Sequence, residues 1–213
     1  MTDNDILENI KISIEREARL DNIRDCFDQL RIMYQPEDYK SYLADIKWLR
    51  NIIMREVKKT KDSLQVINLY DILKKTYLLP AHEDFESYMV YLEWNRKPEE
   101  RFYQPRAKKL RPIVEGLQML ADNELDELFI SQPPRTGKTT LLLFFTTWII
   151  GKNSELSNLY SAYSDIITSA FYNGVIEILK DDYTYLWRDI FPNCTIANTN
   201  AKDEILNIDR TKR

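Results

Sequence analysis

Hydrophobic residues recur every three or four positions through most of the chain, which is the spacing of helices that bury one face. Such segments extend over residues 6–33 (as one or two helices), 37–59, 62–76 and 85–94. Pro36 and Pro80 lie at two of the breaks between them, where proline disfavours a continuing helix. The first part of the chain is therefore predicted to be all-helical.

The pattern changes after the polar segment 96–101, which we expect to separate a helical N-terminal region, residues 1–95, from a second domain, residues 96–213. A helix is expected around residues 110–120, with Pro112 at its start or at a kink. Strand-like and helix-like segments then alternate: strands at 128–131 and 159–163, and helices at 141–150, closed by Gly151 as C-cap, and at 165–180. This alternation predicts an α/β domain with a parallel sheet.

The segment with the most recognisable chemistry is QPPRTGKTT, residues 132–140, between a predicted strand and a predicted helix. Here the backbone N–H groups and the helix N-terminus would face a phosphate, the Lys138 ammonium would reach the β- and γ-phosphates, and the Thr139 hydroxyl would bind Mg²⁺. Gln132 stands where the usual pattern G-x-x-x-x-G-K-[ST] has its first glycine. The alternative is a chance Gly-Lys-Thr before an ordinary helix.

The sequence thus predicts that this loop curls around the triphosphate of ATP, with Mg²⁺ as the metal and Thr139 as its ligand. The loop residues expected to contact the nucleotide are Gln132, Pro133, Pro134, Arg135, Thr136, Gly137, Lys138, Thr139 and Thr140.

The string PPRTGKTT after a short apolar strand resembles the Walker A motif of large terminase subunits, the ATPases that drive DNA into tailed-phage capsids. FYQPR, residues 102–106, is similar to an element that lies before the P-loop in that family, near the nucleotide base. The segment that begins near residue 159 is similar to the family's second strand and helix. The resemblance covers about residues 100–209 and implies an incomplete P-loop NTPase sheet with flanking helices, preceded by an all-α region.

This resemblance implies roles for individual residues. Arg135 would be a catalytic arginine acting in cis on the charge of the γ-phosphoryl group, the alternative being a solvent-exposed loop cation. Tyr103, Gln104 and Arg106 would contact adenine, although a tyrosine before a helix can equally pack in a core. The implied partners are double-stranded DNA, a portal protein, a small terminase subunit and further copies of the chain in a ring, in the cytoplasm of a phage host.

A cationic stretch and a missing motif qualify this prediction. Residues 101–111 contain five cations and no acid: Arg101, Arg106, Lys108, Lys109 and Arg111. Such a stretch can contact the phosphates of a nucleic acid, and the alternative is a helix face that contacts only solvent. A Walker B strand ending in two acids is not identifiable, the nearest string being residues 205–209, and neither is a nuclease domain. We therefore expect the N-terminal portion of a terminase that binds ATP and hydrolyses it slowly, since positioning of the attacking water contributes about 10²–10⁴-fold.

Two other functions fit the same sequence. One is another P-loop nucleic-acid motor, such as a helicase. The other is a non-catalytic helical adaptor, with residues 1–95 as its working surface and a vestigial P-loop.

The amino-acid composition narrows the possible classes of protein further. The chain has 213 residues, of which 44% are hydrophobic, and only 4 glycines, which favours a folded and mostly helical protein. The net charge of −4 argues against a generally polyanion-binding body. Cys26, Cys194 and the single His82 lack zinc-site spacing. We expect no membrane span and no signal peptide, and hence an intracellular protein.

Overall fold

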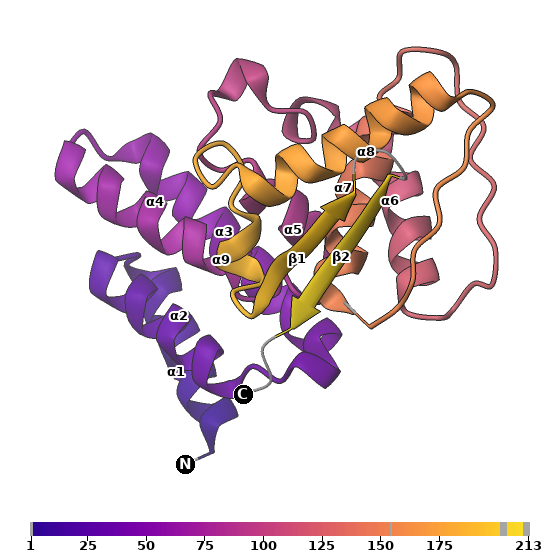
Figure 1. The fold of residues 1–213 in the computed structure, drawn as a ribbon. Coiled ribbons are helices and arrows are strands. Elements are labelled where there is room, and N and C mark those ends of the chain that lie inside the picture. The colour runs from indigo at the N-terminus through magenta and orange to yellow at the C-terminus, as the bar shows by residue number, and fades with distance from the viewer. Residues whose placement is uncertain (1, 154, 201–203, 211–213) are drawn as a thin grey trace. The chain divides into compact units, whose positions relative to one another are not determined.

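The computed structural model describes residues 2–153, 155–200 and 204–210 (Figure 1). Its helices are α1 (Asp3–Arg16), α2 (Leu20–Met33), α3 (Tyr39–Lys59), α4 (Ser63–Leu78), α5 (Phe85–Leu92), α6 (Ala107–Ala121), α7 (Lys138–Lys152), α8 (Asp165–Lys180) and α9 (Trp187–Ile190), and its strands are β1 (Cys194–Asn200) and β2 (Ile205–Arg210). The helices predicted from the sequence, α1 to α8, are confirmed. The short helix α9 and the strand β1 carried no clear periodic signal.

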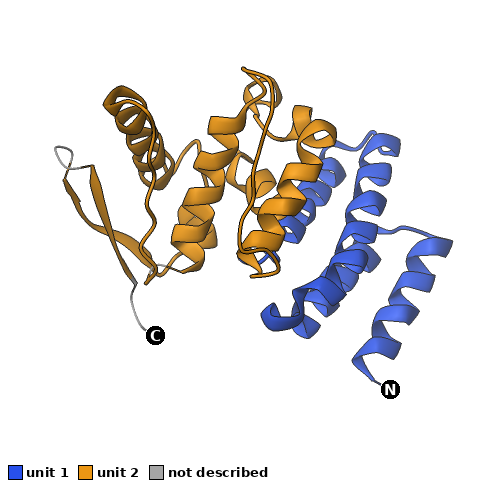
Figure 2. Cartoon of the chain, turned by 90° about the vertical axis from the view of Figure 1, so that its right-hand side faces the viewer, with its two compact units in different colours: residues 1–83 blue, residues 84–213 orange. Residues whose placement is uncertain are grey.

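The chain divides into two compact units, Met1–Glu83 and Asp84–Arg213, which Figure 2 distinguishes by colour. The division falls before α5, whereas the change in sequence pattern had suggested a boundary at residue 95. Helix α5 thus belongs to the second unit, where most of its residues are buried.

The first unit is built from α1 to α4, in which consecutive helices pack on one another. Its fully buried side chains come from the apolar faces of these helices and include Ile14, Ile23, Leu30, Ile46, Leu49 and Ile53. Arg50 is also buried: it donates to the Thr76 carbonyl oxygen at 2.6 Å and lies 3.8 Å from the centre of the Tyr77 ring.

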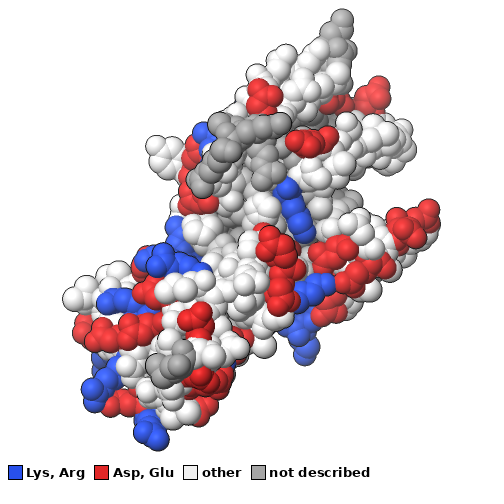
Figure 3. Space-filling model, turned by 90° about the horizontal axis from the view of Figure 1, so that it is seen from below, with Lys and Arg blue, Asp and Glu red and all other residues white. Residues whose placement is uncertain are grey.

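Basic and acidic side chains are intermixed on the molecular face in Figure 3.

The second unit is organised around α7, which is apolar on almost all sides and is therefore expected in an interior. Both α5 and α8 pack against it. Trp148 and Trp187 are fully buried, and the Trp187 indole donates to the Thr147 carbonyl oxygen at 2.9 Å. The Thr147 hydroxyl lies 2.7 Å from the hydroxyl of the buried Tyr88. Aromatic packing and these hydrogen bonds hold the helices around α7.

The predicted α/β class with a parallel P-loop sheet is wrong. The protein is 65% helical, and the strands of its described residues, β1 and β2, form one antiparallel pair with an irregularity between Ile196 and Asn198. The segments 128–131 and 159–163 belong to no helix and no sheet of the described residues. A strand is defined by hydrogen bonds to a neighbour, and an apolar run specifies an extended backbone without specifying that neighbour.

The side chains of segment 128–131 still alternate as in a strand. Leu128 and Ile130 are half-buried, while Phe129 is 90% exposed. On the inner side, the Leu128 methyl groups lie next to Gly116 of α6. The alternation of buried and exposed side chains is present, but the predicted strand at 128–131 is not formed.

Gly151 also differs from expectation. Helix α7 continues through Gly151 to Lys152, and Asn153 is its C-cap. The Phe191 ring packs directly against the glycine, where a Cβ would overlap it. Close packing, and not helix termination, therefore explains this glycine.

No helix in the described part of the chain combines the length and hydrophobicity that crossing a membrane requires.

Candidate functional site

The loop from Gln132 to Gly137 leads directly into α7, as the sequence predicted for a phosphate-binding segment. Gly137 is the N-cap of this helix and has φ = 96°, in the left-handed region. Arg135 also has a positive φ, of 62°. Two left-handed residues close together give the chain a tight turn just before Lys138, the first residue of the helix.

The lysine side chain closes this loop. The Lys138 ammonium donates to the Gln132 carbonyl oxygen at 2.5 Å. The Thr136 hydroxyl donates to the Pro133 carbonyl oxygen at 3.0 Å and to the Gln132 side-chain oxygen at 3.1 Å. Gln132, which replaces the first glycine of the usual motif, thus provides two of the acceptors that shape the loop.

The N-terminus of α7 adds hydrogen-bond donors to the same place. The N–H groups of the first turn, which includes Lys138, Thr139 and Thr140, have no acceptor within the helix because the helix starts there. The N-cap residue, Gly137, has no side chain to cap them. These groups carry the positive end of the helix dipole, so an anion at this end would be stabilised by both hydrogen bonds and charge.

The FYQPR segment, about thirty residues earlier, contacts this loop through Phe102. A Cβ on Gly137 would lie 2.5 Å from Phe102 Cε2 and 2.8 Å from Cζ, so the ring rests against the glycine backbone. The ring also packs against Phe144 of α7, edge to face at 5.6 Å between centroids. The structure therefore brings together the two segments on which the terminase resemblance depends.

The three residues expected near the adenine base have different surroundings. Tyr103 is only 1% exposed, and its hydroxyl donates to Glu86 at 2.7 Å; burial raises the pKa of this phenol. Tyr103 therefore has a packing role here. Gln104 is exposed and accepts a hydrogen bond from Arg101 at 2.7 Å. Arg106 is exposed, donates to the Phe102 carbonyl oxygen at 2.9 Å and lies over the Phe102 ring.

Arg135 and Thr139 are both exposed, Arg135 in the turn before α7 and Thr139 in its first turn. Neither side chain makes a hydrogen bond or an ion pair with the described residues. Both are thus accessible to a ligand at the loop.

Sequence reasoning missed Glu93, the C-cap of α5, which is 1% exposed. Its carboxylate accepts hydrogen bonds from the backbone N–H groups of Phe102 and Tyr103, at 2.9–3.0 Å, and from Arg96 at 3.1 Å. Burial raises the pKa of Glu93, while these backbone N–H groups and the nearby arginines oppose the shift. A single acid within the apolar string YMVYLEW, residues 88–94, was the available signal.

The cationic stretch separates into two parts. Arg101 is half-buried and donates to the carbonyl oxygens of Trp94 and Arg96, so it serves the fold. Lys108, Lys109 and Arg111 are exposed near the start of α6, whose first turn contains no acid. A helix N-terminus disfavours cations, so their position there is unfavourable unless an anion is bound.

No cluster of three or more His, Cys, Asp or Glu side chains that could hold a metal ion occurs within the described residues. Asp209, the acid of the string nearest to a Walker B strand, is exposed on β2 opposite Thr195. At the loop itself, the Thr139 hydroxyl is an exposed oxygen that could contribute to holding a metal ion.

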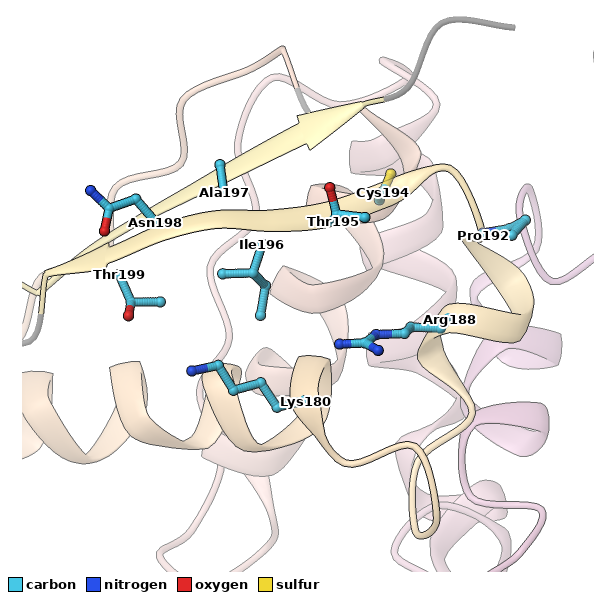
Figure 4. Close-up of a pocket in the computed structure, with 9 residues that line it drawn as sticks. All are labelled: Lys180, Arg188, Pro192, Cys194, Thr195, Ile196, Ala197, Asn198 and Thr199. Carbon is cyan, nitrogen blue, oxygen red and sulfur yellow. The ribbon is translucent and has the colours of Figure 1, made fainter.

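A separate hollow of about 670 Å³ lies beside β1, away from the predicted site residues. The side chains of Lys180 and Arg188 extend into the space below the strand (Figure 4). Arg188 forms an ion pair with Asp182 at 2.9 Å. Both cations are exposed and belong to none of the motifs of the sequence.

No protein-family model, curated protein or solved structure matches this chain. The geometry of the loop before α7 is therefore the basis for assigning a function.

Proposed function

We propose that residues 132–140 bind the triphosphate of ATP together with Mg²⁺, and that the chain is the ATP-binding part of a DNA-packaging motor of the terminase type. The observation that carries this proposal is the backbone at Gly137: a left-handed residue at the N-cap of α7, followed at once by Lys138. This arrangement presents helix N–H groups and an ammonium to the same ligand. The proposal concerns the loop and does not require a parallel sheet.

Lys138 supports the proposal by its present contact. Its ammonium is bonded to the backbone oxygen of Gln132 across the loop, and a phosphate oxygen is a stronger acceptor for a cation than a neutral carbonyl. Binding of ATP would exchange one contact for the other, while the N–H groups of Lys138, Thr139 and Thr140 hold the phosphates. The exposed Thr139 hydroxyl would hold Mg²⁺, which neutralises charge on the phosphate oxygens.

Arg135 is the proposed catalytic residue. Its side chain is exposed and without a partner among the described residues, so it is free to reach the γ-phosphoryl group. An arginine that acts in the transition state contributes more to turnover than to binding. Arg135→Ala should therefore reduce ATP turnover more than ATP affinity, and an equal loss in both would make Arg135 a binding residue.

Double-stranded DNA is the proposed substrate of the motor, and Lys108, Lys109 and Arg111 are the candidates for contacting its phosphates. Their exposure at the N-terminal end of α6 supports this assignment. Replacing Lys108 and Lys109 by alanine should weaken DNA binding and make it less dependent on salt. The portal protein, the small terminase subunit, a ring of identical subunits and a location in the host cytoplasm follow from the resemblance alone.

A thermal-shift titration with ATP and Mg²⁺ tests the proposal. A ligand at 100 times its Kd stabilises the folded state by about 2.7 kcal/mol, so the melting temperature of the wild type should rise with ATP and Lys138→Ala should lose this rise. Lys180→Ala is the matched control, because Lys180 is an exposed lysine at the end of α8. Two results would exclude nucleotide binding at this loop and favour the adaptor function. One is a wild-type melting temperature that does not change with ATP, and the other is an equal rise in the wild type and in Lys138→Ala.

A further inference from the structure

The buried carboxylate of Glu93 connects two parts of the second unit that are distant in sequence. Glu93 is the C-cap of α5, and its two oxygens accept the consecutive backbone N–H groups of Phe102 and Tyr103. Hydrogen bonds to a charged acceptor are about twice as strong as neutral ones, and a pair of them fixes both position and orientation. Glu93 therefore determines where the backbone at Phe102 lies.

The Phe102 ring transmits this position to the loop before α7. It rests against the backbone of Gly137 and, on another side, against the Phe144 ring. Only 8% of Phe102 is exposed, so the ring has little room to adopt another position. Two consecutive contacts thus lead from the Glu93 carboxylate to Gly137: its hydrogen bonds to the Phe102 backbone, and the packing of the Phe102 ring against the glycine.

The charge of Glu93 is compensated locally. Arg96 donates to Glu93 at 3.1 Å and to the Tyr185 hydroxyl at 3.0 Å. Arg101, held by the backbone oxygens of Trp94 and Arg96, adds a second positive charge nearby. These donors and cations offset the cost of burying the carboxylate, since an unsatisfied buried charge is costly.

We infer that Glu93 is a positioning residue of the phosphate-binding loop: through Phe102 it holds Gly137 in the conformation from which Lys138 and the first turn of α7 face the nucleotide. Glu93 is too deeply buried to touch the nucleotide itself. Its effect on ATP affinity rests on the proposed function, whereas its effect on the loop does not.

Glu93→Gln tests this inference, because the amide keeps the shape but turns one acceptor into a donor that faces the Phe102 or Tyr103 N–H group. Glu86→Gln is the matched control: Glu86 lies in the same unit and bonds the Tyr103 hydroxyl, but makes no hydrogen bond to the Phe102 backbone. Hydrogen–deuterium exchange of the peptide 131–141 is measured without nucleotide. We expect faster exchange in Glu93→Gln and unchanged exchange in Glu86→Gln. Equal exchange in wild type and Glu93→Gln would overturn the inference.

Nucleotide affinity gives a second readout. ATP should bind Glu93→Gln about tenfold more weakly at a temperature well below its melting midpoint, the fold-change that corresponds to one charge-assisted hydrogen bond. Lys138→Ala tests the nucleotide site itself. If Lys138→Ala loses ATP binding while Glu93→Gln retains full affinity, the positioning role is refuted and the ATP site stands. If the wild type does not bind ATP, hydrogen exchange alone decides on Glu93.

Phe102→Leu provides a test that leaves the Glu93 hydrogen bonds intact, should Glu93→Gln fail to fold. It removes the ring atoms next to Gly137 and should also accelerate exchange of the peptide 131–141. In the double variant the two effects should be less than additive, since both substitutions interrupt the same path. If the two substitutions increase the exchange rate of this peptide additively, or if Phe102→Leu exchanges at the same rate as the wild type, the ring does not hold the loop.

Discussion

Gly137→Ala should destabilise the second unit for two separable reasons. An alanine in the left-handed region costs roughly 1–2 kcal/mol, and Gly137 has φ = 96°. The added Cβ would also lie 2.5 Å from Phe102 Cε2, inside contact distance, and overpacking of this kind costs about 1–3 kcal/mol. The lower entropy of an unfolded chain with alanine offsets about 0.4–1 kcal/mol. We therefore expect a net loss of roughly 1–5 kcal/mol.

Urea denaturation followed by tryptophan fluorescence measures this loss, because Trp148 and Trp187 are both buried in the same unit. Gly174→Ala is the control: Gly174 is inside α8, has no positive φ, and a Cβ would meet only the movable methyl groups of Leu143, at 3.1 Å. Alanine has a helix propensity about 1 kcal/mol more favourable than that of glycine, so the stability of the Gly174→Ala variant should be unchanged or slightly higher.

A Phe102→Leu background separates the two contributions. There the steric contribution should disappear, and Gly137→Ala should cost only the conformational part less the offset from the unfolded chain, roughly 0–2 kcal/mol. If Gly137→Ala costs no more than Gly174→Ala in the wild type, the left-handed backbone and the contact with Phe102 are both refuted. If the cost is the same in both backgrounds, only the contact is refuted.

Three further predictions concern buried polar groups. Thr147→Val should reduce the free energy of unfolding by about 1–3 kcal/mol, measured by urea denaturation, because the buried Tyr88 hydroxyl loses its partner; a neutral effect would contradict this pairing. Burial raises the pKa of Glu93 above its ordinary value of 4.5, so the folded state binds this proton more tightly than the unfolded chain. The stabilisation that comes from this tighter proton binding is complete below pH 4.5 and is lost as the pH rises through the raised pKa of Glu93. The urea midpoint of the wild type, measured relative to that of Glu93→Gln, should therefore fall with increasing pH, and a rise would contradict the direction of the shift. Burial raises the pKa of Cys26 to about 12, so its thiol should resist alkylation near pH 8 until the protein is unfolded, as mass spectrometry of the modified peptide would show; rapid labelling of the native protein would contradict its burial.

Periodicity predicted the helices well because the signal for a helix lies within the helix itself. Residues three and four apart share one face, so an apolar face such as that of α3 or α6 can be recognised without knowing its partner. The loop before α7 was equally readable, since Gly137 and Lys138 act through local backbone conformation and helix termination.

The parallel sheet could not be predicted correctly from the same kind of signal. The runs 128–131 and 159–163 look like strands in the sequence, but a strand forms only if another stretch of backbone lies beside it, and these runs belong to no sheet. Exposure of Phe129 and Leu159 at 90% and 96% shows how little an apolar residue type reveals about the surroundings of an unpaired segment.

Around the candidate site, sequence determined the chemistry of the loop: its glycine, its lysine and its hydroxyls follow from the order of residues. Tertiary structure decided which residues support that loop. The burial of Tyr103, the contact of Phe102 with Gly137 and the hydrogen bonds of Glu93 all join segments separated along the chain. Local conformation is encoded by neighbouring residues, whereas burial and long-range hydrogen bonds exist only once the helices have packed together.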